Sequence, residues 1–398
     1  MLFAAGDADV EGDPLRDAPE RLQLRRELQR LIAAQSPPEH VSRLDQAGEF
    51  DRALHAELGA LGVMAIGGPA DLGGTGDVRD QVVAIEELAA GPTSMAAFTI
   101  LQYMVIQVLA GFGSGPQRGV LRDLLAARVI VSFCMSEPDG GTDVARAMKT
   151  WAVPDGDSDG WRIRGQKTWI TAATIADYLL VLARTREWER SPVDGVTMFL
   201  IPADSKGIER REIATYGLNA VPTCEVHFDD VRAPANSLVG EVDRGFRNTF
   251  DTLNRERLNA AAASLGGGRA ALAWAIDYAK RRQAFERPIG AFQSIQHALV
   301  DGALGLESAR GLIVRAAEVE AAGGDAGALS TMAKLAASQA ATRATQDAMN
   351  VLAGLGFSRE IPVQRWFRDI RLWTFAPASD EMCRNFLGER WLGLPRSY

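Results

Sequence analysis

The first third of the chain carries apolar side chains at roughly helical spacing. In residues 19–34 the apolar positions follow one face of a helix, and the pattern stops before Ser36-Pro37-Pro38. The same reasoning predicts further helices at residues 50–61, 78–90, 94–111 and 116–127. The segment 94–111 is apolar nearly all round, so we expect it to be deeply buried.

The pattern changes near Val129, where short β-prone runs such as YLLVLAR and VTMFLIP are separated by clusters of Asp, Gly and Pro. This spacing predicts a small antiparallel barrel or sandwich. After Pro234 long helical patterns return, with alanine-rich faces that allow close packing, at residues 243–282, 292–322, 325–353 and 378–392. The predicted fold class is therefore α+β and mostly α, with an N-terminal all-α domain (1–128), a central β-domain (129–235) and a C-terminal domain built on a long four-helix bundle (236–398).

Composition narrows the function without defining it. The chain has 398 residues, is 47% hydrophobic and carries a net charge of −8, which argues against a nucleic-acid-binding surface. Its three cysteines are scattered, so we expect a reducing compartment, no disulfide framework and no metal site. The acidic opening MLFAAGDADVEGD lacks the basic start of a secretory signal, and no apolar run of about 18 residues predicts a membrane span. The expected location is the cytoplasm.

A glycine-rich segment after the first β-run is the first candidate for chemistry. It reads Cys134-Met-Ser-Glu-Pro-Asp-Gly-Gly-Thr-Asp143. Glycines and the hydroxyls of Ser136 and Thr142 would let backbone and side-chain groups approach a polar or anionic ring closely. A plain turn between two strands explains the same residues, and both interpretations stay open.

Further motifs follow in a fixed order. They are Gly165-Gln-Lys-Thr-Trp-Ile-Thr-Ala173, Phe199-Leu-Ile-Pro202, Val226-His-Phe-Asp-Asp-Val-Arg-Ala-Pro234, Arg282 with Phe285 and Gln293, Gly354-Leu-Gly356-Phe357, and Arg368-Asp369. In type and order these segments resemble the acyl-CoA dehydrogenase family over nearly the whole chain. The resemblance implies the three-part fold read above, an FAD cofactor and oxidation of an acyl thioester.

The resemblance also implies roles for individual residues. Those implied to contact the flavin and its phosphates within one subunit are Phe133, Met135, Ser136, Thr142, Trp169, Thr171, Ser379 and Glu381. Those implied to reach the FAD of a neighbouring subunit are Arg282, Phe285, Gln293, Asn350 and Gly354. Each of them could instead be structural, such as a core tryptophan, a surface arginine or a glycine at a helix end. Contacts between subunits imply a homo-oligomer, either a dimer or a dimer of dimers (a homotetramer).

The catalytic base is the point at which the chain departs from the commonest form of the family. The segment after Arg368-Asp369 places Pro377 where many members have the catalytic glutamate, and proline cannot accept a proton. Members of the isovaleryl and long-chain type carry the base on the first bundle helix, and Glu256 matches that position. The resemblance places Asn254, Arg257 and Thr142 on the substrate side. Proline also lacks the backbone N–H that would bind the thioester carbonyl, a loss of about 2.7–4 kcal/mol of transition-state stabilisation; a shifted register would let Ala376 or Ala378 donate instead.

The function predicted from these features is FAD-dependent oxidation of an acyl-CoA or acyl-carrier-protein thioester, with an electron-transfer flavoprotein as acceptor. The departures indicate a specialised biosynthetic substrate in secondary metabolism, such as a hydroxyacyl or short branched acyl group. The alternatives are a flavin-dependent oxidase or monooxygenase that uses O₂, and a binding protein without catalysis. Gln102 and Tyr103, in the predicted buried helix, either meet a polar substrate group or satisfy each other and the backbone.

Overall fold

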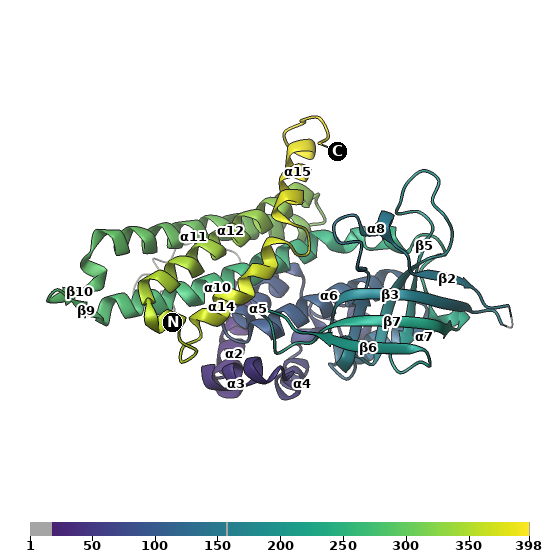
Figure 1. The fold of residues 1–398 in the computed structure, drawn as a ribbon, viewed down its shortest axis with the longest axis horizontal. Coiled ribbons are helices and arrows are strands. Elements are labelled where there is room, and N and C mark those ends of the chain that lie inside the picture. Colours follow the sequence, from purple (N-terminus) through teal and green to yellow (C-terminus); the bar gives the residue numbers. More distant parts are fainter. Residues whose placement is uncertain (1–17, 157, 398) are drawn as a thin grey trace.

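A computed structural model describes residues 18–156 and 158–397. The molecule is elongated, with the β-domain at one end, the long bundle helices extending to the other and the N-terminal helices packed below them (Figure 1). The acidic segment MLFAAGDADVEGD lies outside the described residues. The predicted fold class is confirmed: helices at both ends of the chain flank a central sheet.

The N-terminal part consists of six α-helices within the described residues. Their bounds are α2 Pro19–Gln35, α3 Pro38–Ala47, α4 Arg52–Ala60, α5 Val78–Ala90, α6 Thr93–Phe112 and α7 Gly115–Leu125. Helix α5 has the predicted bounds, and Asp77 and Asp80 form a capping box that explains its sharp start. Helix α3 was not predicted, and its first residue is Pro38, the second of the two prolines before which the first helix was expected to stop.

Helix α6 forms the core of the N-terminal part. It has the length and mean hydropathy of a membrane-spanning helix. The sequence criterion, an apolar run of about 18 residues, did not detect it because polar residues such as Gln102 interrupt the run. Two thirds of its apolar window (67%) is buried inside the protein, where it packs against α5, α7 and α10. Its hydrophobicity therefore serves the core of this fold.

The β-domain is one eight-stranded sheet of order β6-β7-β3-β2-β4-β5-β8, with β1 paired to β4. The strands are β1 Val131–Cys134, β2 Trp151–Pro154, β3 Trp161–Thr171, β4 Tyr178–Arg184, β5 Val196–Pro202, β6 Ile208–Ile213, β7 Thr223–Ala233 and β8 Leu238–Val239, with helix α8 Val144–Ala147 between β1 and β2. Most pairings are antiparallel as predicted, but β1 and β2 both pair with β4 in parallel. Two predicted β-runs, WRIRG and KTWITAA, are one strand, β3.

The C-terminal part is built on three long helices, α10 Leu253–Arg281, α11 Gln293–Ala321 and α12 Gly327–Leu352, followed by α15 Asp380–Arg390. Shorter elements complete it: α9 Gly245–Asn248, β9 Gln283–Ala284, β10 Arg287–Pro288, α13 Gly354–Phe357 and α14 Val363–Asp369. Small residues let the helices approach closely. A Cβ at Gly266 would lie 2.1 Å from the backbone oxygen of Glu86 on α5, so only glycine allows this crossing of α10 and α5.

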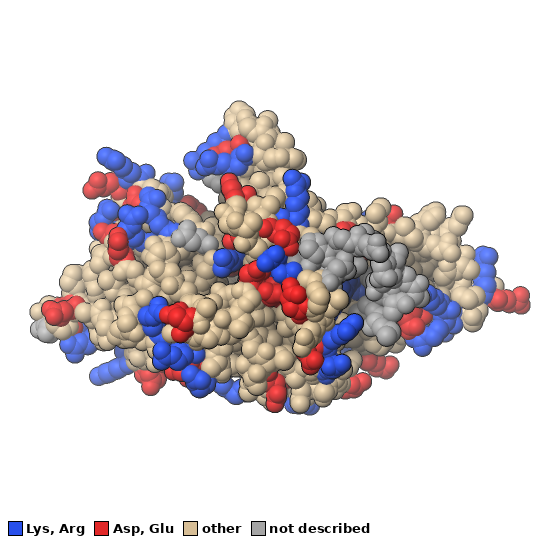
Figure 2. All heavy atoms as spheres, turned by 180° about the vertical axis from the view of Figure 1, so that it is seen from behind, with Lys and Arg blue, Asp and Glu red and all other residues tan. Residues whose placement is uncertain are grey.

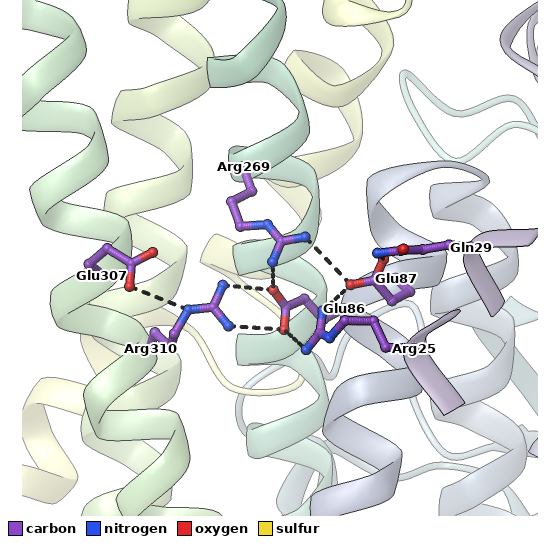
Figure 3. Close-up of polar contacts among 7 residues, drawn as sticks. All are labelled: Arg25, Gln29, Glu86, Glu87, Arg269, Glu307 and Arg310. Carbon is purple, nitrogen blue, oxygen red and sulfur yellow. Dashed lines mark hydrogen bonds and ion pairs between the residues drawn. The ribbon is translucent and has the colours of Figure 1, made fainter. Parts of the chain in front are cut away.

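A buried ionic cluster joins the N-terminal helices to the bundle. Glu86 on α5 lies between Arg25 of α2, Arg269 of α10 and Arg310 of α11 (Figure 3). Burial alone would raise the pKa of Glu86, but the three guanidinium groups hold it well below its usual value. Glu86 therefore stays ionised and neutralises charge contributed by three different helices.

The exposed surface and the cysteines agree with the composition. Acidic and basic side chains are interspersed over the face seen in Figure 2, as expected for a chain of net charge −8 without a basic patch on that face. Cys134, Cys224 and Cys383 are free and buried. Among residues 18–156 and 158–397 no cluster of His, Cys, Asp and Glu could hold a metal ion.

Candidate active site

The ends of β1 and β3 lie side by side and bring together the predicted flavin contacts of the β-domain. The backbone N–H of Thr168 donates to the carbonyl oxygen of Ser136 at 3.0 Å. The hydroxyl of Ser132 donates to the carbonyl oxygen of Thr171 at 2.8 Å. Phe133, Met135 and Ser136 therefore share one edge with Trp169 and Thr171, while Thr142 is exposed in the following loop.

A buried ion pair holds this edge in place. The ammonium of Lys167 is fully buried and donates to the carbonyl oxygen of Met135 at 3.0 Å and to Glu137 Oε1 at 2.9 Å. Burial alone would raise the pKa of Glu137, but Lys167 and the N–H groups of Lys149 and Thr150 lower it. The glycine-rich segment is thus fixed to β3 from inside the domain.

Trp169 is presented to the surface by a β-bulge. The register of β3 against β7 shifts between Lys167 and Ile170, and Trp169 has a φ of 59°, which is uncommon for a large side chain. Its indole is 62% exposed although its neighbours Thr168 and Ile170 are buried. An exposed flat ring held beside the glycine-rich segment suits stacking on a tricyclic cofactor.

Glu256 lines a narrow cavity between α10 and α6. In this structure it leaves no space for a water molecule, and its walls are Gln81, Ile100, Tyr103, Met104, Gln107, Thr252, Arg255, Glu256 and Asn259. Burial raises the pKa of Glu256 to about 7, and the nearby Arg257 only partly opposes this rise. Among the described residues no group donates a hydrogen bond to the carboxyl, so desolvation dominates. A carboxylate of this kind is a competent general base near neutral pH.

The other predicted substrate-side residues of α10 face different neighbours. The Arg257 guanidinium lies 5.4 Å from the centre of the Phe386 ring, and burial lowers its pKa. The Asn254 amide donates to Glu320 at 3.4 Å and accepts from Ser330, which turns it toward α11 and α12 rather than the cavity. Arg255, which was not predicted, lines the cavity and pairs with Glu320 at 3.2 Å.

The segment around Pro377 is held by the bundle. The N–H of Ala376 donates to the carbonyl oxygen of Leu372 at 3.0 Å, so a shift of register to Ala376 leaves no free donor. The buried ammonium of Lys334 donates to the carbonyl oxygen of Ala378 at 2.6 Å and to Asp380 at 2.9 Å. The sequence analysis considered the N–H groups of Ala376 and Ala378 as donors to the thioester carbonyl. Of these two, the N–H of Ala378 has no hydrogen bond within the described part of the chain.

Two residues after this segment complete the predicted contacts within one subunit. Ser379 caps helix α15 by accepting a hydrogen bond from the N–H of Met382 at 3.2 Å. Glu381 is exposed in the first turn of the same helix.

Five predicted contacts lie at the end of the bundle away from the β-domain. The hairpin β9–β10 projects there (Figure 1) and presents Phe285 with 89% of its side chain exposed. Phe285 and Glu286 both have positive φ, the conformation that a two-residue turn of this type requires and that glycine adopts more readily than other residues. Arg282, Gln293, Asn350 and Gly354 are also exposed. Within one chain these residues are separated from Trp169.

The motif Arg368-Asp369 connects parts of the fold. Arg368 forms an ion pair with Asp45 of α3 at 2.6 Å and donates to the carbonyl oxygen of Tyr216. Asp369 accepts a hydrogen bond from the N–H of Leu218 at 2.7 Å. The motif therefore positions the last segment of the chain against the other two domains.

Polar residues of the cavity were only partly predicted. Gln102 exchanges hydrogen bonds with the backbone of Val131, and the Tyr103 hydroxyl donates to the carbonyl oxygen of Val63 at 2.7 Å, so both are satisfied by the backbone. Neither Gln81 nor Asn259, which line the cavity, was predicted from the sequence. The available signal was Asn259 three residues after Glu256, a spacing that places both on one helix face.

The structure thus offers a carboxyl with a raised pKa on α10 and an exposed tryptophan with positive φ on β3, groups that suit a flavin-dependent oxidoreductase. The acyl-CoA dehydrogenase N-terminal, middle and C-terminal domain families match residues 18–126, 132–231 and 243–392, and the chain belongs to the acyl-CoA dehydrogenase family. It is an oxidoreductase acting on CH–CH groups of acyl-CoA, and its family is FAD-dependent.

Relatives in sequence and in structure agree with this assignment. The chain is 35% identical to the mitochondrial short-chain specific acyl-CoA dehydrogenase of Bos taurus, over 92% of this chain and 89% of the relative. The structure of butyryl-CoA dehydrogenase from Megasphaera elsdenii superposes with a TM-score of 0.86 at 29% identity, covering 93% and 98%. A glutaryl-CoA dehydrogenase from Mycobacterium smegmatis in complex with FADH2 superposes with a TM-score of 0.89 at 25% identity, covering 98% of each chain.

The exposed Trp169 leads to a testable expectation for FAD. Replacing it in Trp169→Ala is expected to weaken FAD binding about tenfold, because a stacked aromatic ring is lost. The melting temperature of the FAD-free protein should change little, since the indole is mostly exposed. Titration of the apoprotein with FAD measures the first effect and a thermal melt the second. Trp391→Ala, at a tryptophan that is 60% exposed, is the matched control and should keep normal FAD affinity.

Proposed function

We propose that this protein oxidises a short acyl thioester and that Glu256 removes the proton from its α-carbon. The observation that carries the proposal is the cavity beside Glu256, in which burial raises the carboxyl pKa to about 7. A base that is ionised near neutral pH and poorly solvated takes a weakly acidic proton more readily than a hydrated carboxylate does.

The residues of this chain divide the work of the reaction. FAD, when bound, supplies the acceptor for the hydride that leaves the β-carbon. Trp169 and the edge of β1 would hold its ring, and Lys167 keeps that edge rigid through Met135 and Glu137. Glu256 would take up the α-proton, and the surrounding walls of α6 and α10 shield most of its side chain from solvent.

The departure of the chain from the commonest form of the family at Pro377 supports a specialised acyl group, either a hydroxyacyl or a short branched one. The carrier would be CoA or an acyl carrier protein in a biosynthetic pathway of secondary metabolism. The test is an anaerobic screen of acyl-CoA and acyl-carrier-protein thioesters for bleaching of the bound flavin. Rapid bleaching by short thioesters is expected, and absence of bleaching with every thioester would contradict the proposal.

The rate of flavin reduction is expected to rise with pH through about 7, because only the ionised form of Glu256 accepts a proton. Conformational stability should change in the opposite sense. The pKa of this carboxyl is higher in the folded than in the unfolded chain, so its contribution to stability is complete at low pH and declines as pH rises through about 7. Stopped-flow measurements of bleaching on both sides of pH 7 test the first expectation. A profile without a step in this range would rule out titration of Glu256 as its cause.

Electron transfer and assembly form the second part of the proposal. The reduced flavin would pass its electrons to an electron-transfer flavoprotein. The exposed Phe285 and Arg282, far along the bundle from Trp169, fit a homo-oligomer, a dimer or a dimer of dimers, in which each hairpin β9–β10 reaches the FAD of a neighbour. A protein that sediments as a monomer while holding FAD tightly would argue against this arrangement.

Pro377 supports one alternative, a flavin-dependent oxidase or monooxygenase that uses O₂. Proline removes a donor for the thioester carbonyl, and the N–H of Ala376 is already used within its own turn. Mixing the reduced enzyme with O₂ in a stopped-flow instrument distinguishes the two functions. Slow reoxidation in the presence of product is expected of a dehydrogenase, whereas fast reoxidation would favour the alternative.

A further inference from the structure

Two amide side chains beside Glu256 form a hydrogen-bonded chain with a fixed direction. Gln81 of α5 donates through Nε2 to the carbonyl oxygen of Ile66 at 2.8 Å. Its Oε1 accepts from Asn259 Nδ2 at 3.3 Å. Because a backbone carbonyl can only accept, Ile66 sets the orientation of the Gln81 amide, and Gln81 then sets that of Asn259.

The last group in this series of hydrogen bonds is an acceptor without a donor. Asn259 is 2% exposed, and its Oδ1 has no hydrogen-bond partner within the part of the chain that the structure describes. Reversing the amide would place two oxygens against each other at Gln81, so the oxygen must remain at this end. A buried unpaired acceptor is unfavourable unless a ligand provides a donor.

Asn259 and Glu256 are positioned to contact the same ligand. They are three residues apart on α10 and line the same cavity, so their side chains lie on one face of the helix. The Tyr103 hydroxyl on the facing helix is already bonded to Val63, and Ile100 and Met104 are apolar. Besides the Glu256 carboxyl, Asn259 Oδ1 is thus an acceptor of the cavity that has no donor among the described residues.

The charges around the cavity distinguish between possible donors. Arg255 lines the same cavity, and its guanidinium is already paired with Glu320 at 3.2 Å. A hydroxyl can donate to Asn259 without bringing a further charge into this largely buried site, where an uncompensated charge is costly.

We propose that Asn259, oriented by Gln81, selects an acyl group with a hydroxyl on its β- or γ-carbon over a hydrocarbon group of the same size. This inference rests on the proposed thioester oxidation. That proposal leaves two acyl classes open, hydroxyacyl and short branched, and the inference favours the hydroxyacyl class. The reaction itself is unchanged, with one proton to Glu256 and one hydride to the flavin.

Two pairs of thioesters that exchange a hydroxyl for a methyl group test the proposal. They are 3-hydroxybutyryl against 3-methylbutyryl and 4-hydroxybutyryl against pentanoyl, each presented on CoA and on acyl carrier protein to the FAD-loaded enzyme. Anaerobic bleaching gives kcat/KM, and the flavin absorbance change in Glu256→Gln gives the binding constant without turnover. In at least one pair the hydroxyl member should be preferred about tenfold or more, because the hydrocarbon leaves Asn259 Oδ1 unpaired.

Variants of Asn259 separate recognition from folding. Asn259→Leu should abolish or reverse the preference within the pair. Asn259→Ser should retain it, because a hydroxyl can donate to Gln81 Oε1 and still accept from the ligand. Asn236→Leu, on the exposed surface, is the control for the same chemical change and should leave the ratio unaltered. If Asn259→Leu does not fold, Asn259→Ser and the wild-type ratios still decide the question.

The outcomes distinguish failure of this inference from failure of the proposed function. Preference for the hydrocarbon member of both pairs, or equal losses for both members in Asn259→Leu, would overturn selection by Asn259 while thioester oxidation stands. If no thioester of either pair binds or bleaches the flavin, both the proposed function and this inference are wrong.

Discussion

Glu256→Gln is expected to slow flavin reduction by a thioester by about 10²–10⁴-fold, the usual contribution of a positioned general base. Glutamine has nearly the same shape but cannot accept the α-proton. Since the carboxyl is buried and its raised pKa reflects an unfavourable charge, the variant should fold at least as well as the wild type at pH 8. Anaerobic stopped-flow bleaching measures the rate, and a thermal melt measures the stability.

The matched control for this variant is on the same helix. Asp277→Asn makes the same exchange of carboxylate for amide in the last turns of α10, where Asp277 is exposed and pairs with Arg281. Flavin reduction in this control should be normal. A Glu256→Gln enzyme that reduced its flavin as fast as the control would show that another group removes the proton.

Glu86→Gln is expected to lower the free energy of unfolding by about 3–5 kcal/mol, because it leaves buried arginines without their counter-charge. Arg310 Nη2 lies 2.8 Å from Glu86 Oε1, and its other partner, Glu307, is half exposed (Figure 3). Glu87 continues to pair with Arg25 and Arg269, so Arg310 should account for most of the loss. Denaturant unfolding of the FAD-loaded protein measures the change.

Glu307→Gln is the natural comparison, since it removes the other carboxylate that contacts Arg310. Its side chain is 48% exposed and lies 3.5 Å from Arg310 Nε, so the expected loss is only about 0–1 kcal/mol. Equal losses of unfolding free energy in Glu86→Gln and Glu307→Gln would mean that burial does not determine how much these ion pairs contribute to stability. Because Arg269, Arg310 and Arg25 hold the pKa of Glu86 low, its contribution should also disappear at acid pH as the carboxyl takes up a proton.

The elements that the sequence predicted poorly share a physical cause. Strand β6 was missed because four of its six residues, IERREI, are charged, and it lies at the edge of the sheet where one side is solvated. Strand β3 was read as two runs, WRIRG and KTWITAA, because Gly165 interrupts the β-prone pattern between them, where the register against β7 also shifts. Helix α14 has seven residues and too few turns to display a period.

The candidate site was predicted in part, by two kinds of signal. The order and spacing of the motifs along the chain predicted roles for Glu256, Trp169 and the hairpin around Phe285. The partners Gln81 and Asn259 are 178 residues apart, and neither has a local signature. Their contact exists only because α5 and α10 cross closely, at a point where Gly266 admits the backbone of Glu86.

By itself the sequence determined the order of helical and β-rich regions, the family and the residue types available for catalysis, since periodicity and motif spacing are local properties of a chain. Only the tertiary structure decided which of those residues are buried, paired or exposed. The carboxyl of Glu256 acquires a pKa of about 7, and Asn259 becomes an acceptor without a donor among the described residues, because of the groups that distant segments place around them. Desolvation and hydrogen bonding depend on every neighbour in space, and a linear pattern does not contain that information.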